Sequence, residues 1–454
     1  MSKLTKGEKK EFYKIIFPSM IEILFLQCFS FADSMMVGHM PHSTTAVAAL
    51  SLCNAPINLT VCVTASFFIG TTAAIARNFG AGKPDEVRNT AFQSTVLSFL
   101  LGIVITGITY ILSPQIMGFV CKGSDAYEIA AMYYRINTVG FFFQIVTINI
   151  TAAFRGIGIT KIPMVYNLIG NALNVGLNYV LIYGKLGFAP MQARGAAVAT
   201  VISKLAVFLI ALPLWMFKST PIKPNKSVDT RPCPSLSRFV IPIGLTSACE
   251  QIILQSGATI TSRIISTLPT QHLAACSVSS SVESIAWSTG DACCTASTAL
   301  FGRSLGQNRP EKSKSYLRLI SAWALGFAAF EILLICLFGR RIVMLFSNDA
   351  SIYAEAAAIM TVGAVCLPFI NMHKTVSGAL RSAGDSVAPL LASLLSLWAF
   401  RVGLGYLLIT VLNKGVFAYR WCLNLDQFVR MTAILIFYLT GHWKKYVNRR
   451  QGDK

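Results

Sequence analysis

The chain has 454 residues, of which 54% are hydrophobic and only 13% are charged, whereas about a quarter of the residues in ordinary soluble proteins are charged. This composition excludes an ordinary soluble protein and indicates a polytopic membrane protein. The net charge of +20 does not predict a nucleic-acid partner, because no basic stretch carries the stacking aromatics or the module signature that such binding needs.

Twelve apolar stretches are each about 20 residues long, which is enough to cross a bilayer as a helix. We expect these helices near residues 14–37, 50–76, 90–112, 131–153, 163–184, 195–217, 239–265, 274–301, 316–338, 354–379, 388–411 and 417–440. Six fall in each half of the chain. The segment between the halves, residues 218–238, is basic and rich in proline, which suits a linker. We therefore predict an N-lobe over 1–217, a cytoplasmic linker over 218–238, and a C-lobe over 239–454 with a basic cytoplasmic tail.

The two halves are copies of one sequence, because residues recur at a constant separation of 226 positions. Arg77, Gly80 and Pro84 recur as Arg303, Gly306 and Pro310, and Arg155, Gly158 and Pro163 recur as Arg381, Gly384 and Pro389. With six spans each, both copies enter the membrane in the same direction. The predicted fold is an all-α polytopic membrane protein whose two six-helix lobes are related by a pseudo-two-fold axis along the membrane normal, an arrangement typical of transporters.

Lys and Arg residues gather in the alternate connections that share a side with the two termini. The positive-inside rule assigns that side to the cytoplasm. We therefore expect a multi-pass protein of the cell inner or plasma membrane with both termini cytoplasmic.

The first predicted helix carries two carboxylates, Glu22 and Asp33, inside the apolar stretch. A carboxylate at the bilayer centre costs at least about 2.5–3.5 kcal/mol, so such a group marks an ion or substrate path more often than a structural feature. The two acids are 11 residues apart, which places them on one helix face roughly 16 Å apart, and Gln27 lies beside that face. The alternative for Glu22 is an ion pair with a nearby base such as Lys14.

The fifth predicted helix carries a row of amides. Asn167, Asn171, Asn174 and Asn178 are spaced by four, three and four residues, so all four side chains lie on one face. Amides cannot titrate, but they can hold a carboxylate, a sodium ion or a polar substrate. The alternative is that they bond between helices and join one lobe together.

In the second half, Glu250 lies near the middle of the seventh predicted helix, with Gln255 close by. It is the best carboxylate candidate there. Glu283, Trp287 and Asp291 follow at intervals of four in the eighth helix, and an aromatic ring between two acids can stack on a cationic substrate.

Ion pairing explains the acids of the eighth helix equally well, with Arg263 or Lys204 as the expected partner. Glu331 lies toward the outer end of the ninth predicted helix, and we expect it at the membrane interface.

No catalytic constellation is present in the sequence, which lacks GxSxG, HExxH and Walker patterns. We therefore expect no enzyme activity and no cofactor. An ATP-driven pump is also disfavoured, and the energy for transport is expected from a gradient of protons or sodium.

At this point the sequence resembles the multidrug and toxic compound extrusion family, MATE, and most closely its DinF-like branch. The segments that carry the resemblance lie in both halves and in the family's order. They are residues 33–38 (DSMMVG), 76–82 (ARNFGAG), 155–161 (RGIGITK), 194–200 (RGAAVAT), 381–385 (RSAGD) and 398–401 (WAFR). Each is weak alone, and together on a duplicated chain they are a strong signal.

The resemblance implies antiport, in which proton or sodium entry drives export of amphipathic, often cationic compounds through a cavity between two lobes. The branch's coupling aspartate corresponds to Asp33, and its fifth-helix asparagine to Asn174. The branch carries an aspartate four residues later, where this chain has Asn178, and this departure puts a relay of two carboxylates in doubt. Glu250 resembles the seventh-helix glutamate of the NorM-like branch.

These considerations give the candidate residues. We expect ion coupling at Asp33, Asn174, Asn178 and Glu250, with the first three as the ligands if the ion is sodium, and substrate contacts at Glu22, Gln27, Asn171, Gln255, Glu283, Trp287 and Asp291. The expected partners are a small amphipathic or cationic substrate and the lipid bilayer, without nucleic acid, and the expected state is a monomer.

Two other functions compete with this reading. A flippase for a lipid-linked precursor, from the same broad group, would line its cavity with several bases to hold a diphosphate, whereas the bases inside the predicted helices are scattered. A membrane-embedded enzyme or a sensor would need a metal or nucleophile cluster or an added soluble domain, and the sequence offers neither.

Overall fold

A computed structural model describes residues 4–38, 43–121, 123, 125–224, 233–266, 269–346 and 353–449. Their contacts divide the chain into two compact units. The N-unit is Phe17–Gly244, and the C-unit is Leu245–Lys454 together with Met1–Ile16. The units thus differ from the predicted lobes, because the first 16 residues join the second half and the linker joins the first.

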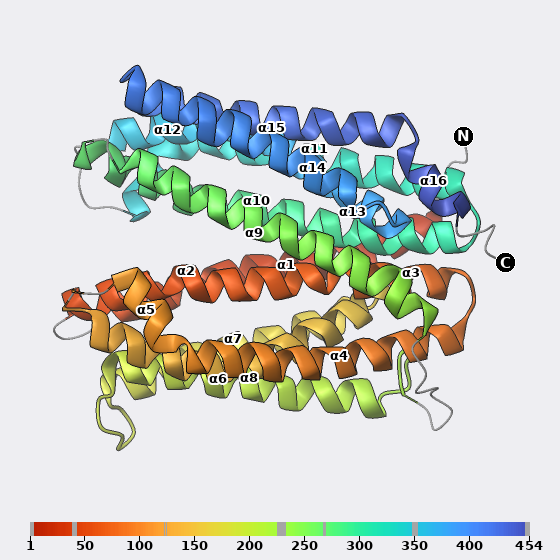
Figure 1. The fold of residues 1–454 in the computed structure, drawn as a ribbon, viewed down its shortest axis with the longest axis horizontal. Coiled ribbons are helices and arrows are strands. Elements are labelled where there is room, and N and C mark those ends of the chain that lie inside the picture. Colours follow the sequence, from red (N-terminus) through yellow and green to blue (C-terminus); the bar gives the residue numbers. More distant parts are fainter. Residues whose placement is uncertain are drawn as a thin grey trace. The chain divides into compact units, whose positions relative to one another are not determined.

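All regular secondary structure among the described residues of the N-unit is helical, and the long helices run side by side (Figure 1). Its elements are α1 (Lys6–Gly38, from Phe17 onward), α2 (Ser43–Phe67), α3 (Ile69–Gly80), α4 (Pro84–Ile111), α5 (Ser113–Cys121), α6 (Tyr127–Gly156), α7 (Lys161–Tyr183), α8 (Gln192–Phe217) and the π-helical turn η1 (Leu236–Val240).

The C-unit repeats this plan. Its elements are α9 (Ile241–Ile265, from Leu245 onward), α10 (Thr270–Gly306), α11 (Pro310–Phe346), α12 (Tyr353–Ala364), α13 (Leu367–Ala383), α14 (Val387–Ser396), the π-helical segments η3 (Leu397–Leu404) and η4 (Leu407–Val411), α15 (Gly415–Leu439) and α16 (His442–Arg449).

All twelve predicted spans fall on helices. The tenth is bent by 40° between α12 and α13. The second is divided into α2 and α3 at Phe68, although Val47–Gly80 still forms one continuous candidate span. Among the described residues, nine helices are long and apolar enough to cross a membrane, or ten if the bent pair is one span. Helices α7 and α10 are not among them, because polar side chains lower their hydropathy. These are the helices that carry the asparagine row and the Glu283–Asp291 segment.

The repeat is visible in the hydrogen bonds as well as in the sequence. The Thr72 hydroxyl on α3 donates to the backbone oxygen of Ala152 on α6 at 3.0 Å. At the equivalent positions in the C-unit, the Thr298 hydroxyl on α10 donates to the backbone oxygen of Gly378 on α13 at 3.3 Å. The two units therefore join corresponding helices by the same contact.

Small residues allow these helices to pack closely, as is usual between membrane helices. Gly195 on α8 lies against α7, where a Cβ would come within 2.7 Å of the backbone oxygen of Leu181. Gly378 on α13 lies against α10, where a Cβ would come within 2.6 Å of the backbone oxygen of Cys294. Larger side chains at either position would push the helix pair apart.

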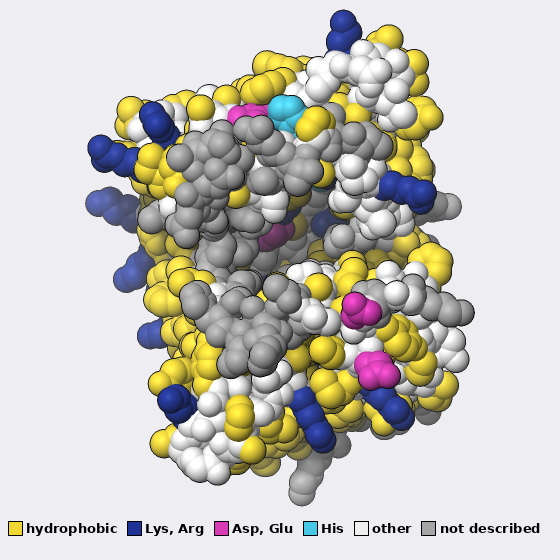
Figure 2. Space-filling model, turned by 90° about the vertical axis from the view of Figure 1, so that its left-hand side faces the viewer, with side chains coloured by type: hydrophobic (Ala, Val, Ile, Leu, Met, Phe, Trp, Pro, Cys, Tyr) yellow, Lys and Arg dark blue, Asp and Glu magenta, His cyan; other side chains and the backbone are white. Residues whose placement is uncertain are grey.

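Hydrophobic side chains fill the interior of each unit and also cover its outside. The N-unit core gathers Phe154, Tyr166 and Trp215 around α6, α7 and α8. On the outside of α4, Leu100 and Ile103 are more than half exposed. Figure 2 shows hydrophobic side chains over much of the surface, interrupted by separate charged groups. An apolar exterior of this kind fits a lipid environment.

Both ends of the described chain lie on one side of the C-unit. Glu11 near the start of α1 forms an ion pair with Arg303 near the end of α10. Trp443 on α16 packs against Phe301, only two residues before Arg303. The shared side agrees with an even number of crossings, and its assignment to the cytoplasm stays a prediction.

Candidate functional site

The carboxylate of Asp33 lies against the asparagine row of α7. The side-chain amide of Asn178 donates a hydrogen bond to Oδ1 of Asp33 and a second one, at 3.3 Å, to Oδ1 of Asn174. The Asn174 amide in turn donates to the Thr200 hydroxyl on α8 at 3.4 Å. A chain of polar groups therefore runs from α1 through α7 to α8, as the sequence predicts for α1 and α7.

The arrangement offers oxygen atoms to a small cation. Asn178 is fully buried, and its Oδ1 has no hydrogen-bond partner among the described residues. No described base pairs with Asp33. A carboxylate beside an unpaired amide oxygen can bind a proton or a hard cation such as sodium.

Glu22 makes a second contact between α1 and α7, nearer the start of α1. It forms an ion pair, but its described partner is Arg155 on α6 and not the nearby lysine that the alternative named; Nη2 of Arg155 lies 3.0 Å from Oε2. The Asn167 amide on α7 donates to Oε1 at 2.6 Å. Gln27 and Asn171 lie between these two contacts along α1 and α7, respectively, and both side chains are half-buried. The asparagine row thus contacts α1 at Glu22 and at Asp33.

Glu250 is held in the same way in the C-unit. Its side chain is 4% exposed, and Oε2 lies 2.5 Å from Nη2 of Arg381 on α13. The Ser393 hydroxyl on α14 donates to Oε1 at 2.8 Å. Gln255, one turn further along α9, is half-buried. Glu250 is therefore tied into the packing of its own unit.

The two ion pairs extend the internal repeat from packing contacts to charged side chains. Arg155 and Arg381 are equivalent positions of the repeat. Glu22 and Glu250 are separated by 228 residues. They are therefore not paired when the two halves are aligned at the repeat offset of 226 residues. Each unit nevertheless uses its own copy of the arginine to hold an acid on its first helix.

The acids of α10 do not share one environment, although they are spaced by two helical turns. Glu283 is buried and forms an ion pair with Arg420 on α15, and both groups contact the Ser279 hydroxyl at 3.1 Å. Asp291 is 60% exposed and pairs with Lys374 on α13 at 2.8 Å. The expected partners Arg263 and Lys204 are wrong, because α15 and α13 supply the bases.

Trp287 lies between these two acids in sequence, and it is half-buried against a hydrophobic cluster of the C-unit. Its backbone oxygen accepts a hydrogen bond from Lys374 at 3.0 Å. The ring packs against this cluster, and Asp291 is the most exposed member of the trio.

One further buried pair was missed in the sequence. Asp426 and Arg430 on α15 are 0% and 4% exposed, and two hydrogen bonds of 2.9 and 3.0 Å join them. Their spacing of four residues inside a predicted span was the available signal. Arg420 of the Glu283 pair lies in the same span and was also overlooked.

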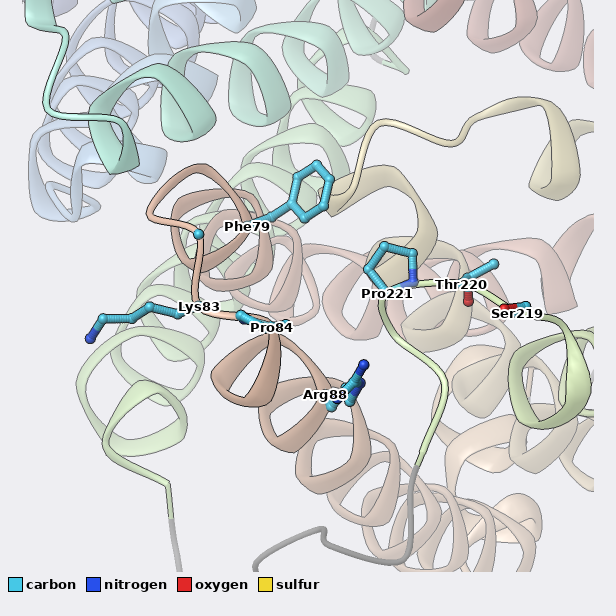
Figure 3. A pocket seen from close by; sticks show the side chains of 8 residues that line it. Phe79, Lys83, Pro84, Arg88, Ser219, Thr220 and Pro221 are labelled. Atoms are coloured by element: carbon cyan, nitrogen blue, oxygen red, sulfur yellow. The ribbon is translucent and has the colours of Figure 1, made fainter.

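A pocket of 430 Å³ lies at one end of the N-unit, between the turn that joins α3 to α4 and the segment after α8 (Figure 3). It is lined by Phe79, Gly82, Lys83, Pro84, Arg88, Ser219, Thr220 and Pro221. Its two bases are already paired with carboxylates of α4, Lys83 with Glu86 and Arg88 with Asp85. In Figure 3, Lys83 points away from the other labelled residues. The pocket contains none of the predicted site residues.

Long apolar helices, a duplicated six-span unit and ionisable groups inside the spans define a polytopic membrane transporter. The comparison with known families gives the particular family. The MatE family model matches residues 18–180 and again residues 246–407, which together exceed half of the chain, and the chain belongs to that family. The double match also agrees with the internal repeat. Members of the family are transporters, so this chain is a transporter and not an enzyme.

Curated relatives match nearly the whole chain. The protein named "Probable multidrug resistance protein NorM" of Thermotoga maritima is 27% identical over 96% of this chain and 93% of its own length. Multidrug resistance protein PmpM of Pseudomonas aeruginosa is 26% identical over 88% of this chain and 84% of its own length. Among solved structures, a MOP superfamily transporter from Pyrococcus furiosus has a TM-score of 0.87 and 21% identity, with 98% of each chain covered. This structural likeness establishes the fold.

Proposed function

We propose that this protein is a secondary active antiporter that exports amphipathic, cationic drugs or toxic compounds in exchange for protons or sodium. The relatives named as multidrug resistance proteins support the class of substrate. The single observation that carries the coupling assignment is the setting of Asp33, which lies in a membrane helix with the Asn178 amide as its described partner. An acid that has no base beside it needs an external cation to neutralise its charge.

Coupling follows from competition for one carboxylate. When a proton or a sodium ion neutralises Asp33, the site loses its attraction for a cationic substrate. When the ion leaves, the substrate binds again. Binding of the ion and binding of the substrate are linked: each weakens the affinity for the other by the same factor. The inward ion gradient therefore drives substrate release on the outside as the two units alternate access.

If the ion is sodium, its ligands on this chain are the carboxylate of Asp33 and the amide oxygens of Asn174 and Asn178. The unpaired Oδ1 of Asn178 favours such a use, because a buried acceptor without a partner is otherwise costly. If the ion is a proton, Asp33 alone carries it, since Asn178 replaces the family's second acid. No cofactor is needed in either case.

The flippase alternative fits less well. A diphosphate site needs bases that are free to pair with it. The bases Arg155, Arg381, Arg420 and Arg430 are each bonded to a carboxylate of their own unit. We therefore keep export of cations as the proposal. It includes a monomer in the plasma membrane with both termini cytoplasmic.

The test is Asp33→Asn, which removes the charge and keeps the shape. We expect cells that carry this variant to lose resistance to cationic compounds while the protein remains in the membrane at wild-type abundance. The matched control is Asp85→Asn, which removes a carboxylate from the same unit at a side chain that is 81% exposed and should leave resistance intact. Wild-type resistance in Asp33→Asn would refute the coupling assignment.

A further inference from the structure

Most acids inside the membrane helices have a base beside them. In the described part of the chain, ion pairs neutralise Glu22, Glu250, Glu283, Asp291 and Asp426. Among the described acids that lie more than one turn from the ends of the long helices, two are not in any described ion pair. One is Asp33 in the N-unit, and the other is Glu331 in the C-unit. Each unit therefore holds one such acid whose charge no base of the described residues balances.

Glu331 lies far from both ends of α11. It is 13 residues beyond Arg318 and nine residues before Arg340, which at 1.5 Å per residue is roughly 20 Å and roughly 14 Å from these bases. It therefore sits within the apolar part of the helix. Its Oε2 is buried and has no hydrogen-bond partner among the described residues.

The surroundings of Glu331 are polar but not basic. The Thr289 hydroxyl on α10 is hydrogen-bonded to the carboxyl group and also lies 3.4 Å from Oδ1 of Asn371 on α13. The Asn371 amide donates to the backbone oxygen of Ala324 on α11 at 3.4 Å. Glu331, Thr289 and Asn371 thus form a polar chain across α11, α10 and α13, which pack together in the C-unit.

We propose that Glu331 is a proton-binding site of the C-unit, separate from Asp33, and that its proton is exchanged during transport. An isolated carboxylate in an apolar interior is neutralised rather than left charged. A proton accounts for this setting, because protonation alone removes the charge of the carboxyl group without further ligands.

The other titratable groups near this site do not offer an alternative partner. On α10 the neighbours are the Cys293 thiol and Asp291. On α13, Lys374 is already bonded to Asp291 and to the backbone oxygen of Trp287. On α12, Glu355 in the first turn contacts His272. The carboxyl group of Glu331 therefore keeps its proton without competition from a base.

The exchange during transport rests on the proposed antiport, whereas binding of the proton does not. Infrared difference spectra of the purified protein, taken in water and in heavy water at neutral pH, report protonated carboxyl groups directly. We expect a protonated-acid carbonyl band that disappears in Glu331→Gln and shifts in Glu331→Asp. The band should persist in Glu22→Gln, whose acid is paired, and in the matched control Glu311→Gln on the same helix, whose side chain is 59% exposed.

In vesicles, uptake of a fluorescent cation driven by a pH gradient should fall at least severalfold in Glu331→Gln and stay at the wild-type rate in Glu311→Gln. An unchanged band in Glu331→Gln would overturn the proton site, and unchanged uptake would overturn its exchange during transport. Failure of the proposed antiport has a different signature, because Asp33→Asn would then transport normally while the Glu331 band remains.

Discussion

Removing Arg381 should isolate a buried carboxylate and destabilise the C-unit. The side chains of Arg381 and Glu250 are 11% and 4% exposed, so water cannot replace the lost partner. Breaking one side of a buried ion pair costs about 3–5 kcal/mol. Because the Ser393 hydroxyl still donates to Glu250 at 2.8 Å, we expect Arg381→Met to lower the free energy of unfolding by about 3 kcal/mol, near the lower end of that range.

The equivalent pair in the N-unit provides the comparison. Arg155 is 26% exposed, Glu22 is 10% exposed, and Glu22 keeps its hydrogen bond from Asn167 at 2.6 Å. Solvent screening and the remaining bond should limit the cost of Arg155→Met to about 1–2 kcal/mol. The same change at equivalent repeat positions thus has different expected effects.

The assay is denaturant unfolding of the purified protein in mixed micelles, followed by helical circular dichroism, with a double-mutant cycle. Removing both charges by combining Arg381→Met with Glu250→Gln leaves no isolated charge. The double variant should therefore recover about 1–3 kcal/mol of the summed single losses. A loss below about 1 kcal/mol in Arg381→Met, or strict additivity in the cycle, would refute the reasoning.

Two further predictions concern the C-unit. A Cβ added at Gly363 would collide with the Glu283–Arg420 pair, so Gly363→Ala should cost about 1–3 kcal/mol of stability; thermal unfolding at the wild-type temperature would contradict this. Asp291 is exposed and paired with Lys374, so Lys374→Gln should lower the KM for a cationic substrate and Asp291→Asn should raise it, each by up to about fivefold. Movement of both KM values in the same direction would rule out contact of Asp291 with the substrate.

The helices were predictable because apolar length is a local property of the sequence. All twelve predicted spans fall on helices. The breaks were not predictable in the same way. Phe68 separates α2 from α3 without any proline or glycine at the break itself, and packing within the unit decides such positions. The transfer of residues 1–16 to the C-unit likewise depends on contacts with residues near 300–316, far away in the chain.

The candidate acids were predictable, and their partners were not. A carboxylate in an apolar stretch is visible in the sequence, as for Glu22, Asp33 and Glu250. Arg155 lies 133 residues from Glu22 and Arg381 lies 131 residues from Glu250, so only the fold brings them together. This is why the sequence placed Glu250 among the coupling candidates, whereas its observed setting resembles a structural ion pair.

The most direct test of the account is transport by the purified protein in vesicles with no energy source except an imposed ion gradient. We predict that a proton or sodium gradient alone drives movement of a fluorescent cation in the opposite direction. We also predict that Asp33→Asn abolishes this movement and that Asp85→Asn preserves it. Transport that ignores both ion gradients, or that continues at the wild-type rate in Asp33→Asn, would contradict the central claim.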